Sequence, residues 1–425
     1  MTLDNSRIRR RNVLQGVGGS VTALSLAGCL NIGGGGSSDG SIDFAFSGPM
    51  SGPSASVGEE MKRGAELAKE KINSDGGIDG QDVNLHIADT ESEPAAGRNA
   101  VSSLLQTESI DVLTGGFHTD VSVAVMELAA QEEVPQMISN SVGGTINTRV
   151  KENNYKHSFK MAPPHEAYGV GWAAWLQYLQ ENEVGYFPFD SPQIALVGEN
   201  TSYGNPIVDS VESNLQESDG NWDVLSKDSH EYNETDFQSL LTRIESNDPD
   251  IILCAQSNPS AAGNFISDFG DVGFEDTHLL MTWTPSNPTT LETGGSTSNG
   301  VLWLTNIGVL PSQSETLRSA WNDAYDSSFP GTNASLAYDN LLIVAKALKE
   351  IGGVEDLDVS TWEETVLNLE YEGTAGTFRF QEENHQSEWG PDSGIPPLGN
   401  QVRDMSNHLV WPDEHAEAEI DEGLY

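Results

Sequence analysis

Apolar positions from residue 42 onward follow two alternating spacings. Period-two runs at Ile42–Ser47 and Val83–Ala88 predict strands, and helical spacing across Glu59–Asn73 predicts a helix between them. The pattern continues with helices expected at Pro94–Gln106 and Val121–Gln131, and strands at Ile110–Thr114 and Pro135–Ser139. Because strands alternate with helices, this part of the chain predicts βαβ units with a parallel sheet covered by helices on both faces.

A second α/β series begins near residue 166. Strands are expected at Gln193–Val197, Trp222–Ser226, Asp250–Ala255, His278–Trp283 and Val301–Asn306, with helices at Glu166–Gln180, Pro206–Gln216, Phe237–Ser246 and Ala261–Phe269. Helices at Glu315–Asp326, Leu336–Ile351 and Trp362–Leu369 and strands at Thr377–Phe380 and Leu409–Trp411 follow, and the acidic tail after Pro412 is expected to be frayed.

Two α/β sheets place ligand sites at the carboxyl ends of their parallel strands. The candidate site therefore lies on the loops that follow the predicted strands: Gly48–Gly58, Asp89–Glu93, Gly115–Asp120, Asn140–Thr148, Gly198–Gly204, Gln256–Ser260 and Thr284–Thr290.

The N-terminal segment predicts export and anchoring. Arg10 and Arg11 precede the weakly apolar stretch Val13–Leu26, a pattern similar to a twin-arginine export signal and too short to span a bilayer. The stretch ends at Leu26-Ala27-Gly28-Cys29, which resembles a lipoprotein signal-peptidase site with Cys29 as the lipidated residue. Residues 1–28 are thus a predicted signal peptide and residues 29–40 a flexible tether. A poor anchor helix or a frayed arm is the alternative.

The net charge of the chain indicates the kind of environment in which the protein works. The chain has 20 Lys and Arg against 65 Asp and Glu, a net charge of −45, yet 37% of its residues are hydrophobic. Acids dispersed through periodic apolar segments indicate a folded core under an acidic shell, a pattern typical of proteins of extreme halophiles, archaeal in type. An acidic Ca²⁺-binding protein is the alternative, but no Asp-x-Asp-x-Asp-Gly loop is present. No basic stripe exists for a nucleic acid.

The sequence offers little for catalysis. It contains no Gly-x-Ser-x-Gly elbow between a predicted strand and a predicted helix and no His-Glu-x-x-His motif, and no metal or cofactor is expected. Cys254 lies in the apolar run Ile251–Ala255, where a buried strand residue is expected. With Cys29 acylated, no intramolecular disulfide can form, so the core must supply stability.

The candidate loops carry a set of motifs in a consistent order. Gly48 to Gly52 reads Gly-x-x-Ser-Gly, Gly64-Ala65 follows on the next helix, and Ala68 to Ile78 reads Ala-x-x-x-Ile-Asn-x-x-Gly-Gly-Ile. Asp89 with Glu93-Pro94, Thr201 to Gly204, Ala337-Tyr338-Asp339 and Gly373 to Gly376 followed by Phe380 complete the set. These motifs resemble the branched-chain amino-acid-binding proteins of ABC importers, which have the periplasmic-binding-protein type I fold.

The resemblance implies two Rossmann-like lobes joined by three crossovers, with ligand bound between them as the hinge closes. Lobe 1 would comprise residues 41–161 plus 305–374, and lobe 2 residues 162–304 plus 375–425. It further implies a small-molecule ligand and ABC permease subunits as partners. We expect a lipid-anchored monomer on the outer face of the membrane. A ligand-sensing domain of a surface signalling system is the alternative, which neighbouring genes would discriminate.

The resemblance also implies the ligand contacts. Thr119, before the helix Val121–Gln131, would offer its hydroxyl and the free N–H groups of the helix start to a carboxylate. The alternative is that Thr119 or Asp120 serves only as a helix cap. The other residues expected at the site are Ser141, Val142, Tyr203, Asn258, Phe117, Trp283, Thr284 and His118. Core packing is the alternative for Phe117, Tyr203 and Trp283, and a solvated loop position is the alternative for His118.

The sequence does not decide whether the ligand carries an ammonium group. Amino-acid-binding members carry a carboxylate where this chain has Thr284, and a buried ammonium without an anion is costly. Either another acid, such as Asp89 or Asp120, pairs with an amino acid, or the ligand is an amide, urea or small carboxylic acid read by Thr119, Ser141 and Thr284. Branched-chain or related amino acids are slightly favoured.

Overall fold

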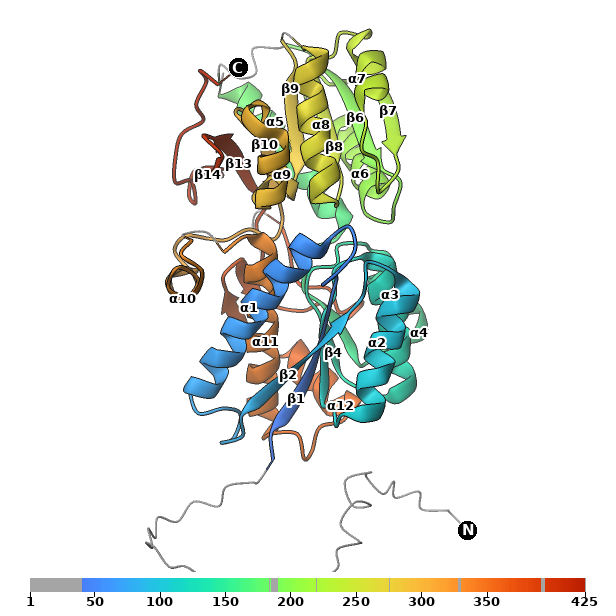
Figure 1. Cartoon of the computed structure of the whole chain (residues 1–425), viewed down its shortest axis with the longest axis vertical. Helices are drawn as coiled ribbons and strands as arrows, with labels where there is room; N and C mark the ends of the chain where they lie inside the picture. Colours follow the sequence, from blue (N-terminus) through green and yellow to red (C-terminus); the bar gives the residue numbers. More distant parts are fainter. Residues whose placement is uncertain are drawn as a thin grey trace, which may run out of the picture. The chain divides into compact units, whose positions relative to one another are not determined.

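The computed structural model describes residues 40–424 except 183, 185–189, 219, 275, 328–329 and 391–393. The predicted signal peptide and lipidation site Cys29 lie outside the described residues. The described chain forms two lobes, each built on its own sheet (Figure 1). This confirms the predicted fold class of two α/β lobes with parallel sheets.

The first lobe is built on a five-stranded parallel sheet of order β2-β1-β3-β4-β5. Its strands are β1 (Ile42–Gly48), β2 (Val83–Asp89), β3 (Val112–Gly115), β4 (Gln136–Ile138) and β5 (Ser158–Lys160). Its helices are α1 (Ala55–Ser74), α2 (Pro94–Thr107), α3 (Thr119–Glu132), α4 (Thr145–Asn153), α11 (Thr332–Ile351) and α12 (Val359–Leu367).

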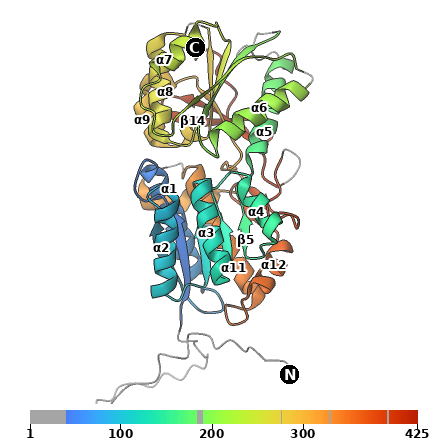
Figure 2. The same ribbon diagram turned by 90° about the vertical axis from the view of Figure 1, so that its right-hand side faces the viewer.

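Alternation along β1 explains the layers of this lobe. Phe44 and Phe46 join the apolar core that includes residues of α1 and α11, whereas Ala45 belongs to the cluster formed with α2 and α3. Helix α1 (blue) lies beside α11 (orange) in Figure 1, and α2 and α3 lie side by side on the other face in Figure 2. Gly64 permits the close approach of α1 to α11, since a Cβ there would lie 2.0 Å from the Ala334 carbonyl oxygen.

The second lobe has a seven-stranded sheet of order β14-β13-β10-β9-β8-β6-β7. Strands β6 (Gln193–Glu199), β7 (Asp223–His230), β8 (Ile251–Ala255), β9 (His278–Thr282) and β10 (Leu302–Thr305) run parallel, and β13 (Leu398–Arg403) and β14 (Ser406–Trp411) are antiparallel additions. The helices are α5 (His165–Glu181), α6 (Gly204–Glu217), α7 (Gln238–Glu245), α8 (Pro259–Val272) and α9 (Pro288–Gly294). Cys254 is buried on β8, as predicted.

The chain passes between the two sheets three times: after β5, after β10, and before β13. Helix α10 (Glu315–Tyr325) lies in the second connection, and the short hairpin β11 (Tyr371–Gly373) and β12 (Gly376–Phe378) precedes the third. The exact lobe boundaries stay a prediction. None of the helices in the described ranges has both the length and the apolar character needed to cross a membrane.

Several expectations about individual elements are wrong. Helices α4 and α9 and strands β5, β11 and β13 were not expected, because they are short and lack a clear apolar period. The tail after Pro412 is not frayed: the N–H groups of Glu417 and Ala418 donate to the Leu409 carbonyl, and Gln401 bonds both backbone polar groups of Asp421. Ala418 and Ile420 pack against the apolar core, which explains why the acidic tail is ordered.

Candidate ligand-binding site

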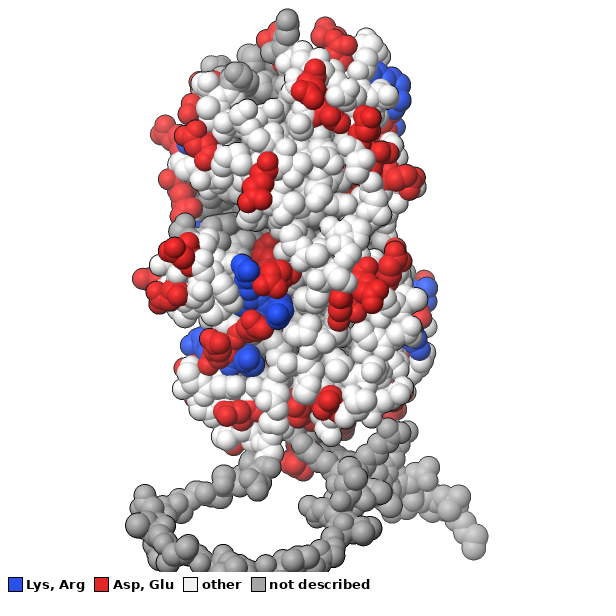
Figure 3. Space-filling model, viewed as in Figure 1, with Lys and Arg blue, Asp and Glu red and all other residues white. Residues whose placement is uncertain are grey.

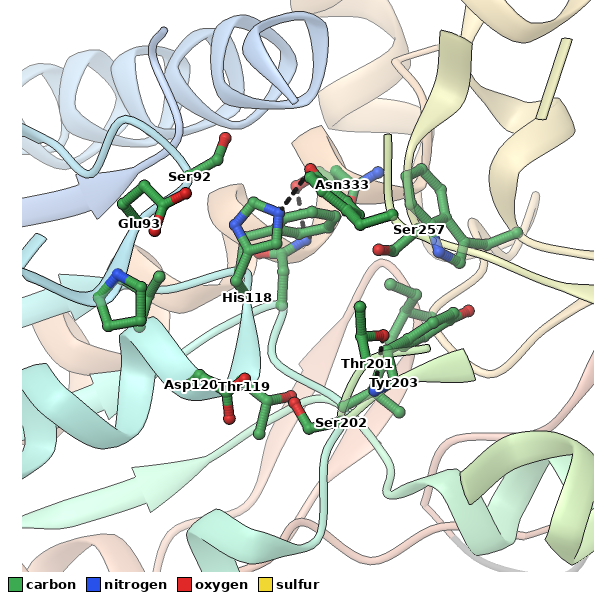
Figure 4. A pocket seen from close by; sticks show the side chains of 18 residues that line it. Ser92, Glu93, His118, Thr119, Asp120, Thr201, Ser202, Tyr203, Ser257 and Asn333 are labelled. Atoms are coloured by element: carbon green, nitrogen blue, oxygen red, sulfur yellow. Dashed lines mark hydrogen bonds between the residues drawn. The ribbon is translucent and has the colours of Figure 1, made fainter. Parts of the chain in front are cut away.

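A cavity of about 220 Å³ opens where the carboxyl ends of the two sheets face each other. First-lobe residues that line it are Ser92, Glu93, Pro94, Phe117, His118, Thr119, Asp120, Val121, Asn140, Val142 and Asn333, and the others are Thr201, Ser202, Tyr203, Tyr232, Ser257, Trp283 and Ile307. Figure 4 shows Ser92, Glu93 and His118 on one side, and Thr201, Ser202 and Tyr203 on another. Six of the nine predicted site residues line this cavity: Phe117, His118, Thr119, Val142, Tyr203 and Trp283.

The first-lobe wall is the start of α3. Gly115 and Gly116 adopt positive φ angles of 82° and 101° and turn the chain from β3 into the helix. Helix α3 begins at Thr119 after His118 at the N-cap, and neither Thr119 nor Asp120 serves as a side-chain cap, so that alternative is wrong. The first N–H groups of a helix have no intrahelical acceptor, which makes this wall able to bind a carboxylate.

Thr119 also fixes the neighbouring loop. Its Oγ1 accepts a hydrogen bond of 3.1 Å from the Gly143 N–H, which leaves the hydroxyl proton available for a ligand. The two residues approach so closely that a Cβ at Gly143 would lie 2.4 Å from Thr119 Cγ2. Ser141 does not line the cavity: its hydroxyl donates to the Phe117 carbonyl at 2.9 Å and lies 2.5 Å from Ser122 Oγ, so it ties two loops together.

Aromatic rings form most of the apolar wall. Phe117 packs edge-on against Trp283, with ring centroids 5.8 Å apart, and His118 packs edge-on against Tyr232 at 5.6 Å. Burial lowers the pKa of His118 to about 4, so the imidazole is neutral at pH 7. His118 is therefore not a solvated loop residue, and it adds no positive charge to the cavity.

Tyr232 is one of the lining residues that the sequence did not indicate, and it lies outside the loops that the sequence assigned to the site. It lies on the loop between β7 and α7, and its hydroxyl lies 2.5 Å from Ser54 Oγ and 3.0 Å from His118 Nε2, both in the first lobe. Strand β7 was predicted to end at Ser226 because its last residues are polar, and the loop after it was therefore not considered.

Asn258 and Thr284 do not reach the cavity, although both were predicted to do so. Asn258 caps α8: its Oδ1 accepts from the N–H groups of Ser260 and Ala261, and its Nδ2 donates to the Tyr232 carbonyl at 3.0 Å. Asn258 thus holds the loop of Tyr232 in place. Thr284 is fully buried in the short 3₁₀ turn Thr284–Ser286.

Two acidic residues of the motifs hold loops rather than line the cavity. The Asp89 carboxylate accepts from the N–H and hydroxyl of Ser51, at 3.1 and 2.7 Å, and so fixes the Gly48–Gly52 loop. Asp339 accepts from the N–H and hydroxyl of Thr374, at 2.7 and 2.8 Å. Of the two acids considered as ammonium partners, Asp89 lies outside the lining and Asp120 lies within it but is exposed.

A buried carboxylate lies directly behind the second-lobe wall. Glu199 is 0% exposed, and its carboxylate accepts from Ser257 Oγ at 2.8 Å, Ser257 N at 3.0 Å and Thr201 Oγ1 at 2.9 Å. Burial raises the pKa of Glu199, and these donors act in the opposite direction. Both Ser257 and Thr201 line the cavity.

Comparison with known proteins fits this bilobed architecture. The sequence profile of the family described as "Periplasmic binding protein" matches residues 41–388, most of the chain. The chain belongs to the periplasmic binding protein family. Proteins of this family are solute-binding proteins rather than enzymes.

Curated relatives carry the names of homologs of Leu/Ile/Val-binding proteins. The chain is 26% identical to Leu/Ile/Val-binding protein homolog 7 of Brucella abortus over 88% of this chain and 92% of the relative. It is 25% identical to homolog 3 of Brucella melitensis, over 48% of this chain and 51% of the relative. The match to homolog 3 thus spans about half of the relative's length, and a match to homolog 2 of Brucella abortus spans 62% of it.

Solved structures share the fold at low identity. A putative branched-chain amino acid ABC transporter protein of Silicibacter pomeroyi has a TM-score of 0.78 at 22% identity, covering 90% of this chain and 99% of the other. A branched-chain amino acid transporter substrate-binding protein of Streptococcus pneumoniae, in complex with isoleucine, has a TM-score of 0.74 at 18% identity, covering 88% and 100%. A solute-binding protein of Rhodopseudomonas palustris, in complex with benzoate, has a TM-score of 0.71 at 18% identity, covering 91% and 99%.

Proposed function

We propose that this solute-binding protein captures an amino acid with an apolar side chain, or a close analogue, between its two lobes and delivers it to an ABC importer. The observation that carries the proposal is the cavity itself, which joins the amino end of α3 to aromatic walls from both lobes. Its volume of about 220 Å³ is below the roughly 300–1,000 Å³ of sites for drug-sized ligands, which favours a small solute.

The amino end of α3 supports a carboxylate on the ligand. Among the described lining residues there is no Lys or Arg, so a carboxylate would be held by N–H groups and the Thr119 hydroxyl rather than by an ion pair. The helix dipole adds a favourable partial positive charge at that point. The apolar part of the ligand would then lie between Phe117, Tyr232 and Trp283.

Aromatic carboxylic acids are the second candidate ligand class. The edge-on ring pairs Phe117–Trp283 and His118–Tyr232 offer the faces and edges that a ligand ring packs against. A structure of the same fold binds benzoate. The carboxylate of such a ligand would bind at the amino end of α3. Because the ligand has no ammonium group, it would need no anion in the second lobe.

Calorimetric titration in high salt tests the proposal. We expect leucine, isoleucine or valine to bind, and Thr119→Ala to weaken binding by about tenfold or more through loss of one hydrogen bond to a charged group. Thr107→Ala, on the exposed end of α2, serves as the control and should not change the affinity. Binding of benzoate with no heat from any amino acid would replace the first ligand class by the second.

We also propose that the protein is held at the outer face of the membrane by a lipid on Cys29. The Leu-Ala-Gly-Cys sequence and the polar tether after it support this. Mass spectrometry of the native protein should show that residues 1–28 are absent and that Cys29 carries lipid, and Cys29→Ser should release the protein into the medium. An intact N-terminus would contradict this. Neighbouring permease and ATPase genes would support import, whereas a transducer gene would support sensing.

The acidic surface supports a working environment of molar salt. On the face shown in Figure 3, acidic side chains are scattered widely and basic side chains are few. Removal of residues 1–28 would leave 16 basic and 64 acidic residues, a net charge of −48. We propose that high salt screens the repulsion that this charge creates.

A further inference from the structure

We propose that the Ser257 hydroxyl, oriented by the buried carboxylate of Glu199, accepts the hydrogen bond of the ligand's ammonium group, so that Glu199 selects amino acids over simple carboxylic acids. This inference rests on the proposed function and adds a specificity-determining residue to it. The carboxylate that amino-acid-binding relatives carry at the position of Thr284 would thus be supplied here by Glu199, at the end of β6.

The placement of Glu199 follows from the sheet. Strand β6 ends at Glu199, and its neighbour β8 ends at Ala255, with Gly198 paired to Ala255. Because the two parallel strands end together, the loop after β8 passes beside the Glu199 carboxylate and brings Ser257 to it. Glu199 is 0% exposed and Ser257 5% exposed, so solvent does not compete for their hydrogen bond.

The hydrogen bonds fix the direction in which each hydroxyl acts. Glu199 accepts from Ser257 Oγ, Ser257 N and Thr201 Oγ1, and these donors favour its carboxylate form against burial, which raises its pKa. The Ser257 hydroxyl has one proton and donates it to Glu199, so only its lone pairs remain for the cavity. Ser257 therefore presents an acceptor to the ligand, and the charge behind it strengthens that acceptor.

Thr201 does not compete for this role. Its Oγ1 donates to Glu199 and accepts from the N–H groups of Tyr203 and Gly204, which uses both of its lone pairs. Thr201 thus connects Glu199 to the start of α6 and keeps the carboxylate in place. Ser257 remains as the acceptor through which Glu199 can act on a ligand.

Other acids near the cavity are less suited to hold an ammonium group. Glu93 and Asp120 line the cavity but are exposed, where water and salt screen their charges. Asp89 already accepts from Ser51 and from the Glu91 N–H. Glu199 combines burial with contact to a lining residue, and a buried charge acts on its neighbour with little screening.

A pair of ligands that differ only in the ammonium group tests the inference. Leucine and 4-methylpentanoate share one carbon skeleton, and titrations in high salt would measure both on the wild type, Glu199→Gln and Ser257→Ala. We expect the wild type to prefer leucine, and each variant to lose leucine affinity by about tenfold or more while its affinity for 4-methylpentanoate changes by less than about twofold. Glu217→Gln, exposed at the end of α6, is the matched control and should keep the preference.

The outcomes separate this inference from the proposed function. Equal losses for both ligands would assign Glu199 a purely structural role and overturn the inference, as would a wild type that binds both ligands equally. Ser257→Ala decides the question if Glu199→Gln does not fold, because it leaves the carboxylate and removes only the hydroxyl. A wild type that binds no amino acid at all would instead overturn the proposed function.

Discussion

The Tyr232 hydroxyl of the second lobe lies 2.5 Å from Ser54 Oγ of the first lobe, a contact between residues 178 positions apart in the chain. The same hydroxyl lies 3.0 Å from His118 Nε2, so one phenol bonds two side chains of the opposite lobe. Tyr232 also lines the cavity. Tyr232 therefore links the wall of the cavity to the contact between the two lobes, and we expect its hydrogen bonds to favour the closed form.

We expect Tyr232→Phe to favour the open form. It keeps the ring but removes the hydrogen bonds that join the lobes, at a cost of about 1 kcal/mol, so ligand affinity should fall by about fivefold. Calorimetry gives the affinity, and small-angle X-ray scattering should show a larger radius of gyration without ligand. Tyr178→Phe is the control, because Tyr178 bonds Asp413 within the second lobe at 2.6 Å. Unchanged affinity and radius would exclude this role of Tyr232.

The burial of the Glu60 carboxyl group predicts that the stability of the protein depends on pH. Its carboxylate on α1 accepts from the N–H groups of Asn333 and Ala334 at the start of α11, at 2.8 and 3.2 Å, and from Asn287 Nδ2 of the second lobe at 3.2 Å. Burial raises the pKa of Glu60 from 4.5 to about 7, and the hydrogen bonds lower it. The folded state thus binds this proton more tightly than the unfolded state does.

The consequence is a loss of stability as pH rises. The contribution of Glu60 is fully present below pH 4.5 and is lost as pH rises through about 7, on the order of 3 kcal/mol in total. Glu60→Gln cannot ionise, so its free energy of unfolding should depend less on pH over this window. Urea unfolding of both proteins at several pH values measures the difference. Parallel pH profiles would exclude the ionisation of Glu60 as the cause.

We expect Gly64→Ala to destabilise the first lobe. The new Cβ would lie 2.0 Å from the Ala334 carbonyl oxygen and force α1 and α11 apart. We expect the cost of such overpacking, about 1–3 kcal/mol, to exceed the roughly 1 kcal/mol that alanine gains over glycine in a helix, because the clash is with backbone. Thermal unfolding measures the change. Glu70→Ala, at an exposed position of the same helix, is the control and should change the free energy of unfolding by less than about 0.5 kcal/mol. A Gly64→Ala variant as stable as the wild type would contradict the prediction, because it would show that the two helices can separate without cost.

Low salt should destabilise the protein. Its net charge of −45 is screened over about 3 Å in 1 M salt but over about 10 Å at 0.1 M, so repulsion grows as salt is removed. Circular dichroism melts should show a much lower transition temperature at about 0.1 M than at about 3 M KCl. Sucrose at low salt is the control for general stabilisation and should not restore the transition fully. Identical melts would contradict adaptation to high salt.

The sequence shows which residues belong to the motifs, but it does not show which contacts these residues make. Asp89 and Asp339 could be recognised from their neighbours, yet only the folded chain places them on Ser51 and Thr374. Thr284 was expected in the site because it follows a strand at the position where the resembled family carries a carboxylate, but the 3₁₀ turn buries it. Position after a strand thus predicts the region of a site and not the direction of each side chain.

The sequence by itself determined the alternation of strands and helices, the two α/β sheets and the loop Gly115–Asp120 as part of the site. These depend on local periodicity and on the rule that ligands bind where parallel strands end. The residues Phe117 to Thr119 within that loop were indicated by the resemblance of the motifs to a known family. The tertiary structure alone decided the roles of Tyr232 and Glu199. Tyr232 follows a polar edge strand with little apolar pattern, and Glu199 meets Ser257 from a neighbouring strand 58 residues away. Such pairings depend on sheet order and lobe contact, which no local pattern encodes.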